Sequence, residues 1–432
     1  MEEKRIADYE VFPSVVRSGE NSSIAIKPRG EHARFIDEFK YIITFIPMEG
    51  RNVKYEPGVS ERKKYDTLET SPQNGTISFT YCFTGEQEWS VTIKEKDSRN
   101  CEKVFHIYSL LPDLHGKKAY KGDLHIHSNK SDGAEEPAIV AANYRKAGFD
   151  FMAITDHHRW YPSKEAIDKY KGVDIDLKMF FGEEVHVPDN YIHMVNFGGQ
   201  ISVNELYENN KQQIDEEISR AAENISAPEG VNALEYSYRK WIVDNIRKGS
   251  GLAILVHPFW IWDHVYNMQT KMTEYMFETQ YYDAFELLGG QTAFENNMQT
   301  ALYYEQRARG RSIPIVGSSD SHGTEPPVWF NSIKTILFSE DLELDSICKN
   351  IKSLYSAAVA NTGEGMRVDG PFRMVKYAMF LLKYYFPRHD ELCFEEGVLM
   401  KNYACGDRTA GKLLELYAGR TAEFADKFFG TT

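Results

Sequence analysis

Cysteine is scarce in this chain of 432 residues. The five cysteines are scattered, and no two of them form a Cys-x-x-Cys pair: Cys82, Cys101, Cys348, Cys393 and Cys405. An odd number leaves at least one thiol unpaired in any disulfide scheme. We therefore expect reduced thiols, as in a cytoplasmic protein.

Long apolar runs are also missing. No stretch approaches the roughly 20 apolar residues of a membrane span. The first ten residues, MEEKRIADYE, are acidic and lack the apolar segment of a signal peptide. We expect neither secretion nor membrane insertion.

Positive charge is in deficit, since 50 Lys and Arg face 64 Asp and Glu and leave a net charge of -14. Nucleic acids and anionic membranes attract basic surfaces, so neither is expected as a general partner. A local positive site remains open, because bound metal ions can supply one. The aromatic share of 13% and the hydrophobic share of 42% indicate a globular protein, long enough for two or three domains.

Residues 1–116 contain short stretches of alternating apolar and polar side chains. Ile77, Phe79 and Tyr81 alternate with polar residues, and Trp89 and Val91 continue the pattern after a turn around 84–88. Runs at 24–26, 41–46 and 104–110 are also rich in strand-forming residues. We predict a β-sandwich that packs against a catalytic core, with a carbohydrate-binding or partner-binding module as the alternative.

From residue 117 to 365, strand-like apolar runs alternate with helical stretches, which is typical of an α/β fold. We count seven such runs: 124–126, 149–154, 179–185, 192–197, 252–256, 284–288 and 313–316. Pro137 suits the first turn of a helix between the first two runs, and Gly148 suits its end. The prediction is a short, distorted (β/α)7 TIM-like barrel with a helical insertion at about 203–249.

Residues 366–432 predict a C-terminal helical extension. Apolar residues recur there at spacings of three and four, as in Phe372, Val375 and Met379. A homodimer contact or a membrane-surface face would give the same stripe. Packing on the chain's own barrel is preferred, because the flanking charge is mixed rather than basic.

Histidines and acids gather at the ends of the barrel runs. His125 and His127 stand two residues apart, so both rings point to the same side of an extended chain. Barrel active sites collect at the carboxyl ends of strands, and only His193, at the start of its run, departs from that rule. The repetition predicts a metal site, whose mixed donors suit Zn, Mn or Fe: His125, His127, Asp132, His157, Glu184, His193, His257, Asp320 and His322.

The ordered motifs resemble those of the polymerase and histidinol phosphatase (PHP) superfamily of metal-dependent phosphoesterases, of the type with an N-terminal β-sandwich. They read His-x-His with a following Asp, Thr-Asp-His, Gly-x-Glu, a lone His, His-Pro and Asp-x-His, over roughly 119–360. The resemblance implies two or three divalent ions. The first would be held by His125, His127, Glu184 and Asp320, the second by Glu184, His193 and His257, and the third by Asp132, His157 and His322.

A charge count indicates what such a site would bind. Three divalent ions bring +6 and three carboxylates remove 3, which leaves about +3 for a phosphate ester dianion. Ions close together also lower the pKa of bound water, and a metal-bridging hydroxide would attack phosphorus. The expected function is hydrolysis of a phosphate ester of a small molecule or nucleotide (EC 3.1).

Further side chains near the ligands have less certain roles. Lys130, His158 and Arg159 follow ligands and would meet a phosphate or leaving group, or only solvent. Asp123 and Asp156 would orient imidazoles. Glu183 competes with Glu184 as a ligand. Four aromatics would stack on a substrate or, as we prefer, pack: Trp160, Tyr161, Trp260 and Trp262. The histidines outside the pattern include His106, His115, His186, His264 and His389.

Three alternatives stay open. An amidohydrolase-like barrel also begins with His-x-His, but Glu184 and the paired Asp320-x-His322 argue against it. A metal-loaded binding or regulatory module would need no catalysis. A nuclease is disfavoured by the acidic balance of the chain.

Overall fold

The computed structural model describes residues 8–50, 65–97, 102–188, 191–362 and 365–431. The chain divides into two compact units. Unit 1 comprises Met1–Lys118, Phe380–Tyr385 and Thr421–Thr432, and unit 2 comprises Ala119–Met379 and Phe386–Arg420. The residues expected as one C-terminal extension are therefore shared between the two units.

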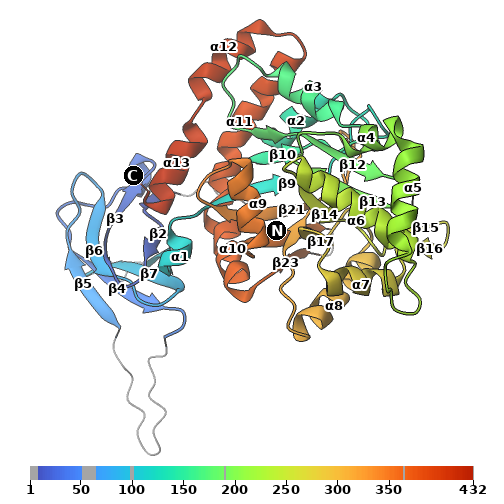
Figure 1. Ribbon diagram of the computed structural model, residues 1–432. Coiled ribbons are helices and arrows are strands. Elements are labelled where there is room, and N and C mark those ends of the chain that lie inside the picture. Colours follow the sequence, from blue (N-terminus) through green and yellow to red (C-terminus); the bar gives the residue numbers. More distant parts are fainter. Residues whose placement is uncertain (1–7, 51–64, 98–101, 189–190, 363–364, 432) are drawn as a thin grey trace, which may run out of the picture. The chain divides into compact units, whose positions relative to one another are not determined.

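Unit 1 is built from strands in two sheets (Figure 1). One sheet has the order β1-β3-β6 and the other the order β2-β8-β7-β4-β5. Among the described residues of these two sheets, the strands pair antiparallel except β2 with β8, which pair parallel. The bounds are β1 Tyr9–Phe12, β2 Val15–Arg17, β3 Asn21–Pro28, β4 Tyr41–Pro47, β5 Asp66–Thr70, β6 Ile77–Cys82, β7 Gln87–Glu95 and β8 Lys103–Leu110.

The alternating residues of unit 1 explain its core. Ile26 and Phe79 from the first sheet and Phe45 and Trp89 from the second are buried in one hydrophobic cluster. β3, β4 and β6 therefore bury one face and leave the other more exposed, as period-two patterns predict. The turn after β6 leads into the other sheet, so β6 and β7 are not paired with each other.

Unit 2 contains two larger sheets, with the orders β11-β10-β9-β21-β22-β23 and β12-β13-β14-β17-β18. Isolated parallel bridges, His157 to Glu184 and Ile126 to Ser321, join strand ends of one sheet to those of the other. The bounds are β9 Lys118–Asp123, β10 Phe151–Ala153, β11 Lys178–Phe180, β12 Gly182–His186, β13 His193–Phe197, β14 Leu252–Leu255, β17 Ala284–Leu288, β18 Ile315–Gly317, β21 Ile333–Ser339, β22 Ser356–Thr362 and β23 Gly365–Asp369.

The expected mixed α/β fold is present, but its strands differ from the predicted set. The run at 179–185 is divided into β11 and β12, and 124–126 follows β9 rather than forming its own strand. β12, β13 and β14 pair antiparallel, whereas a regular barrel is parallel. β21, β22 and β23 were not predicted. They extend the sheet of β9 and give it six strands.

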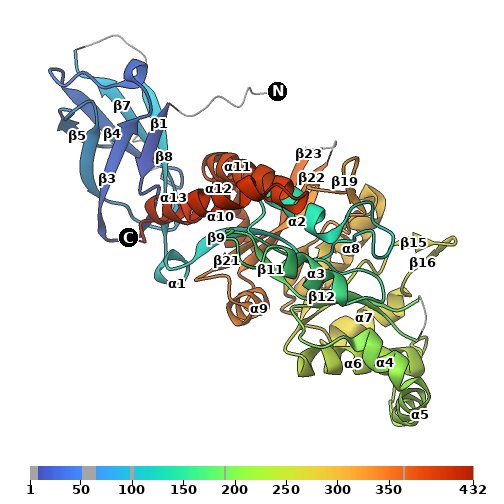
Figure 2. The same cartoon turned by 90° about the horizontal axis from the view of Figure 1, so that it is seen from above.

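The helices of unit 2 connect and cover these strands (Figures 1 and 2). α2 begins at Pro137, and Gly148 with φ +89° follows its end, as the sequence predicts. The segment 203–249 is helical as expected. The bounds in unit 1 are α1 Pro112–His115 and α13 Arg420–Phe429, of which all but Arg420 belongs to that unit. The bounds in unit 2 are α2 Pro137–Lys146, α3 Tyr161–Lys169, α4 Val203–Asn209, α5 Lys211–Ala222, α6 Ala233–Lys248, α7 Thr270–Thr279, α8 Ala293–Ala308, α9 Leu344–Lys352, α11 Phe386–Ala404 and α12 Arg408–Tyr417. α10, Phe372–Tyr384, has residues in both units.

Two short hairpins, β15–β16 (Ile261–Trp262 and Val265–Tyr266) and β19–β20 (Gly323–Thr324 and Pro327–Val328), complete unit 2. Within the described ranges, no helix has the length and apolar content that crossing a membrane requires. Four of the cysteines are free thiols, whereas Cys101 lies outside the described residues.

Candidate functional site

All nine predicted ligands lie in one cluster in unit 2, with Glu184 of β12 at its centre. Its Oε1 lies 2.8 Å from His193 Nδ1 and 3.2 Å from His257 Nε2. Its Oε2 lies 2.7 Å from His157 Nδ1 and 3.4 Å from His125 Nε2. One buried carboxylate is thus shared by imidazoles from four different segments of the chain.

Two further carboxylates complete the cluster. Asp320 Oδ1 lies 2.9 Å from His127 Nε2. Asp132 Oδ2 lies 3.3 Å from His157 Nε2 and 3.4 Å from His322 Nε2. Donor atoms within 4.8 Å of one another form several groups that can each hold an ion, among them His127 with Asp132, His157 and His322, His125 with His127 and Asp320, and His125 with Glu184 and His257.

The fit of this donor set to metal ions can be tested on its buried atoms. Among the described residues, His125 Nε2, His127 Nδ1 and Glu184 Oε2 are shielded from solvent and make no hydrogen bond of good geometry. Buried polar atoms without partners are costly, and proteins rarely leave them so. Their residues belong to the groups whose ligand atoms lie within 4.8 Å of one another, and this set of ligand atoms therefore fits divalent cations.

The electrostatics keep the carboxylates charged. Burial alone would raise the pKa of Glu184, but the imidazoles of His157, His186 and others together hold it well below its usual range. Burial also opposes ionisation of Asp320, and His125 and His127 outweigh it, so its pKa is lowered. Ionised carboxylates are the form that binds a metal.

The pKa values of two imidazoles in the cluster are shifted in opposite directions. Burial would lower the pKa of His157, but Glu184 and Asp132 together raise it to about 10. Burial, with the charge of His157, lowers the pKa of His127 to about 3. His127 is thus a neutral ring, whereas His157 in the metal-free cluster holds a proton that a cation would displace.

Two carboxylates that we expected to orient imidazoles instead hold the loops that carry the ligands. Asp123 accepts hydrogen bonds from Ser319 N at 3.0 Å and from the Tyr144 hydroxyl at 3.0 Å. Asp156 accepts one from Ser128 N at 2.8 Å. The expectation was wrong about the partner, because each carboxylate faces backbone amides and hydroxyls rather than rings.

The ring of His125 is oriented by Glu286 of β17, which sequence reasoning missed. Glu286 Oε2 lies 3.0 Å from His125 Nδ1, so Nδ1 can donate to it and leave the Nε2 lone pair free. His322 is fixed similarly, since its Nδ1 lies 2.8 Å from the carbonyl oxygen of Asp320. The sequence signal that could have found this residue was an acidic side chain, Glu286, within the otherwise apolar run of β17.

His186, placed outside the pattern by its sequence, lies inside the cluster. Its Nε2 is 3.4 Å from Glu184 Oε2 and 3.0 Å from His157 Nδ1. Burial lowers its pKa to about 4. His186 is two residues beyond Glu184 on β12, so the same i, i+2 rule that paired His125 and His127 could have found it.

Glu183 does not compete with Glu184, because it points to the other face of β12. Its carboxylate accepts hydrogen bonds from Val203 N at 2.5 Å, Ser202 Oγ at 2.8 Å and Asn204 Nδ2 at 3.0 Å. These donors lie at the start of α4, where a negative charge is favourable. Glu183 therefore anchors a helix.

Two ligands and one residue that lines the cavity have strained backbone. The ligands His257 and Asp320 have φ values of +25° and +49°, and His158 has a φ of +58°. Such conformations are uncommon for residues with a Cβ and cluster at functional sites. Gly133 has a related role, because a Cβ there would lie 2.7 Å from the carbonyl carbon of His127.

The cluster opens into a cavity of about 770 Å³. His158 and Arg159 line it, as expected. Lys130 does not line it, and its ammonium instead binds Glu136 at 2.8 Å and Glu165 at 3.3 Å. The role proposed for Lys130 from the sequence is therefore not supported by its position.

The four loop aromatics divide into two pairs. Trp260 and Trp262 line the cavity. Trp160 and Tyr161 do not, and the Trp160 indole donates to Gly199 O at 2.8 Å and packs on Phe181. Packing, our preferred interpretation, therefore describes Trp160, whereas Trp260 and Trp262 contact each other and also border the cavity.

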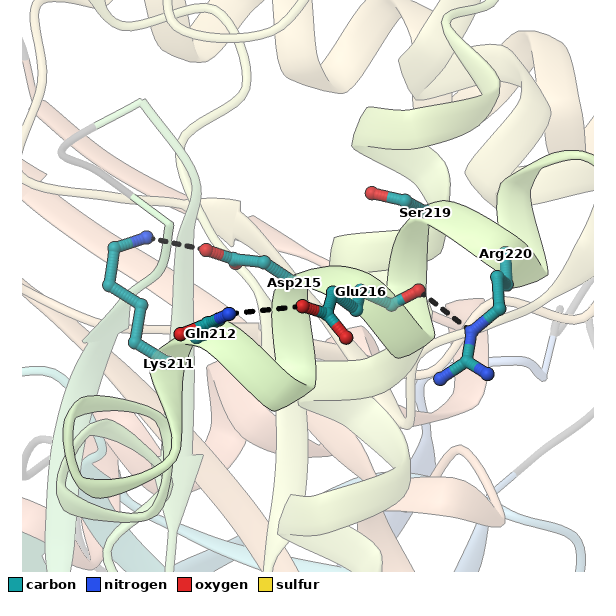
Figure 3. A pocket seen from close by; sticks show the side chains of 6 residues that line it. All are labelled: Lys211, Gln212, Asp215, Glu216, Ser219 and Arg220. Carbon is teal, nitrogen blue, oxygen red and sulfur yellow. Dashed lines mark hydrogen bonds and ion pairs between the residues drawn. The ribbon is translucent and has the colours of Figure 1, made fainter.

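A second hollow of about 720 Å³ lies along α5 (Figure 3). All its lining residues come from this one helix, and several bind one another along it, as Lys211 binds Asp215 at 2.7 Å. Paired side chains on a single helix face offer no converging groups for a ligand, so this hollow is not a candidate site.

Comparison with known families agrees with the motifs. Residues 123–288 match the model described as "PHP domain". This part of the chain is therefore similar to PHP domains. Asp320 and His322 lie beyond the matched residues, so their membership of the cluster rests on geometry.

Solved structures similar to the chain come from bacteria. A two-domain protein of Bacteroides vulgatus containing a predicted PHP-like metal-dependent phosphoesterase has 16% identity and a TM-score of 0.40, with 58% of this chain and 67% of that chain covered. A protein of Bifidobacterium adolescentis, provisionally named a metal-dependent phosphoesterase, has 16% identity, a TM-score of 0.34 and coverage of 47% and 88%. No curated protein matches the chain.

Proposed function

We propose that the protein is a metal-dependent hydrolase that cleaves phosphate esters of a small molecule or nucleotide. The two bridged sheets of unit 2 would form its distorted (β/α)7 barrel, with the site where their strand ends meet. The observation that carries the proposal is the buried donor set around Glu184, in which His125 Nε2, His127 Nδ1 and Glu184 Oε2 find no hydrogen-bond partner among the described residues.

Up to three divalent ions would share these donors. The first takes His125, His127, Glu184 and Asp320, the second Glu184, His193 and His257, and the third Asp132, His157 and His322. Short distances between donors within each group support this division. Zn, Mn and Fe all accept such mixed nitrogen and oxygen ligands. When bound, the ions neutralise the phosphate, activate water and stabilise the leaving oxygen.

The surrounding residues prepare the donors and the substrate. Glu286 holds His125 with Nε2 free, and the Asp320 carbonyl does the same for His322. Arg159 brings a guanidinium to the cavity wall, where it can bind phosphate oxygens through two parallel N–H groups. His158, beside it, can give a proton to the departing alcohol.

Metal content and turnover test the proposal together. Purified full-length protein is analysed by mass spectrometry for transition metals, before and after soaking in Mn²⁺ or Zn²⁺, and assayed on an aryl phosphate. We expect bound metal and hydrolysis. Glu183→Gln is the matched control, because it changes the neighbouring carboxylate, which lies on the other face of the strand. This variant should keep both the bound metal and the hydrolysis. A folded protein that takes up no metal would refute the proposal.

A further inference from the structure

We propose that the cavity selects esters whose alcohol part carries a planar ring with hydrogen-bond acceptors, and that Trp262, Trp260 and Asn267 form the subsite for that ring. This inference rests on the proposed phosphoesterase function, whose substrate class it narrows. The three side chains belong to the β15–β16 hairpin and the residues that flank it, at the margin of unit 2 (Figure 2).

An aromatic wall begins directly at the imidazole cluster. The Trp260 ring centroid lies 5.7 Å from those of both His193 and His257. Trp262 continues the wall, with its centroid 5.5 Å from that of Trp260 and the two planes 31° apart. A substrate with its phosphate at the cluster would therefore extend its alcohol part along two indoles.

The wall is exposed although it is apolar. Trp262 is 62% and Val265 63% exposed, and both line the cavity. Large apolar side chains gathered beside polar groups in a hollow mark binding sites, because exposure of such side chains is otherwise unfavourable. The open face of Trp262 can accept a flat ring by stacking.

The hairpin is held in place before any ligand binds. Asn267 N donates to Trp260 O at 2.8 Å and closes the hairpin at its base. Ile261 N donates to Glu295 Oε1 at 2.8 Å, and Glu295 is itself fixed by a capping box with Thr292. A platform anchored in this way loses little conformational entropy when a ring stacks on it.

Asn267 supplies a polar group beside the wall. Its Nδ2 is shielded from solvent and makes no hydrogen bond with any described residue, although the side chain lines the cavity. An amide donor left without an acceptor is unfavourable until a ligand provides one. A ring nitrogen or carbonyl oxygen meets that need, and a plain hydrocarbon ring does not.

The size of the cavity and the charge of its lining narrow the class of substrate further. A cavity of about 770 Å³ is far larger than a phosphate group and suits a drug-sized ligand. Asp263 also lines it, and Arg159 is the one lysine or arginine among its described lining residues. A second phosphate near the hairpin would meet negative rather than positive charge, so a neutral heteroaromatic ring is favoured there over a polynucleotide backbone.

The test compares a nucleoside 5′-monophosphate with ribose 5-phosphate, which lacks the ring. We expect wild type to prefer the nucleotide, and Trp262→Ala to lower the ratio of the two kcat/KM values by about 5- to 150-fold, the range that base stacking on an aromatic side chain gives. Asn267→Ala should lower the ratio of kcat/KM for the nucleotide to kcat/KM for phenyl phosphate, whose ring has no hydrogen-bond acceptor. Ile261→Ala, on the same hairpin but outside the cavity lining, should leave both ratios unchanged.

Equal turnover of the two esters by wild type, or an unchanged ratio in Trp262→Ala, would overturn the subsite. Calorimetric binding on the same proteins separates this result from failure of the proposed function. If neither ester is hydrolysed but the nucleotide binds more tightly than ribose 5-phosphate and loses that advantage in Trp262→Ala, the subsite stands and the phosphoesterase proposal fails.

Discussion

Unit 2 buries two clusters of histidines and acids, and they differ in how their charges are balanced. The second cluster lies between α11 and the start of β10. There His389 Nε2 lies 2.8 Å from Asp150 Oδ1, and His389 Nδ1 lies 3.2 Å from Asp390. Cys393 Sγ lies 3.6 Å from the same ring, so these donors also meet the distance criterion for a metal.

The second cluster nevertheless contains its own counterions. Asp390 binds Lys121 at 2.6 Å, and Arg145 binds Glu396 at 2.6 Å. Burial opposes the imidazolium of His389, but Asp150 and its neighbours raise its pKa well above the usual value. Around Glu184, by contrast, buried donors lack hydrogen bonds and open into a cavity. Donor type alone thus does not identify a metal site. Buried ligand atoms without hydrogen bonds, in a cluster that borders a cavity, do identify one.

The largest expected effect is that of removing the central carboxylate of the first cluster. Glu184→Gln should lose bound metal and lower kcat/KM by about a thousandfold or more, because metal ions supply several kcal/mol of transition-state stabilisation and each 1.36 kcal/mol is tenfold. Metal analysis and steady-state kinetics measure this. Retained metal and activity would contradict the assignment of Glu184.

Breaking the second cluster should instead reduce stability. Arg145→Met leaves Glu396 buried without its main cation and leaves Asp150 with His389 alone, which costs about 3–5 kcal/mol in the free energy of unfolding. Denaturant titration measures the loss, while metal bound per folded molecule should not change. Lys164→Met, at an exposed pair with Asp168, is the control and should alter stability by less than about 1 kcal/mol. An equal loss in both variants would contradict the distinction.

His186 tests how far the first cluster extends. His186→Asn should weaken metal binding or activity by about 10- to 100-fold, the usual effect of losing a residue that supports a metal ligand. Competition with a chelator gives the affinity. A loss as large as that of Glu184→Gln would make His186 a direct ligand, and no loss would exclude it from the site.

The smallest effect concerns pH. The pKa of His389 is raised in the folded protein, so its stabilisation is fully present below the unfolded value of about 6.5 and is lost as pH rises through the folded pKa. The stability difference between wild type and His389→Gln should therefore shrink by about 1 kcal/mol or more on going to high pH. His32→Gln, at a surface histidine 73% exposed, should show no such trend.

The sequence predicted the ligands of the cluster better than the residues that hold those ligands in place. Ligands such as His257 and Asp320 could be found because each stands at the end of an apolar run, where strand geometry brings side chains together. Glu286 could not be paired with His125 in advance, because their contact spans 161 positions and depends on which strands face each other. Asp123 was noticed, but its partner Ser319 follows a strand of the other sheet.

Much of the fold could likewise be predicted from the sequence, but the order of the strands within the sheets could not. Alternation and strand-forming residues predicted β3, β4, β6, β7 and β8 of unit 1, but not β1, β2 and β5, nor that β6 and β7 would enter different sheets. In unit 2 the strands β21–β23 were not predicted, because they carry none of the ligand motifs that marked the other runs. Periodicity reports the face that a strand buries, whereas pairing depends on contacts that are distant in sequence.

The separation of the ligands along the chain bears on synthesis. The first histidine of the cluster stands at position 125 and the last at 322, and the carboxylate that binds His127 stands at 320. A growing chain that has just passed His125 and His127 still lacks all four carboxylates near these rings, Asp132, Glu184, Glu286 and Asp320. The complete site can assemble only after His322 has left the ribosome, so metal loading follows synthesis of this whole segment and cannot nucleate the folding of its first strands.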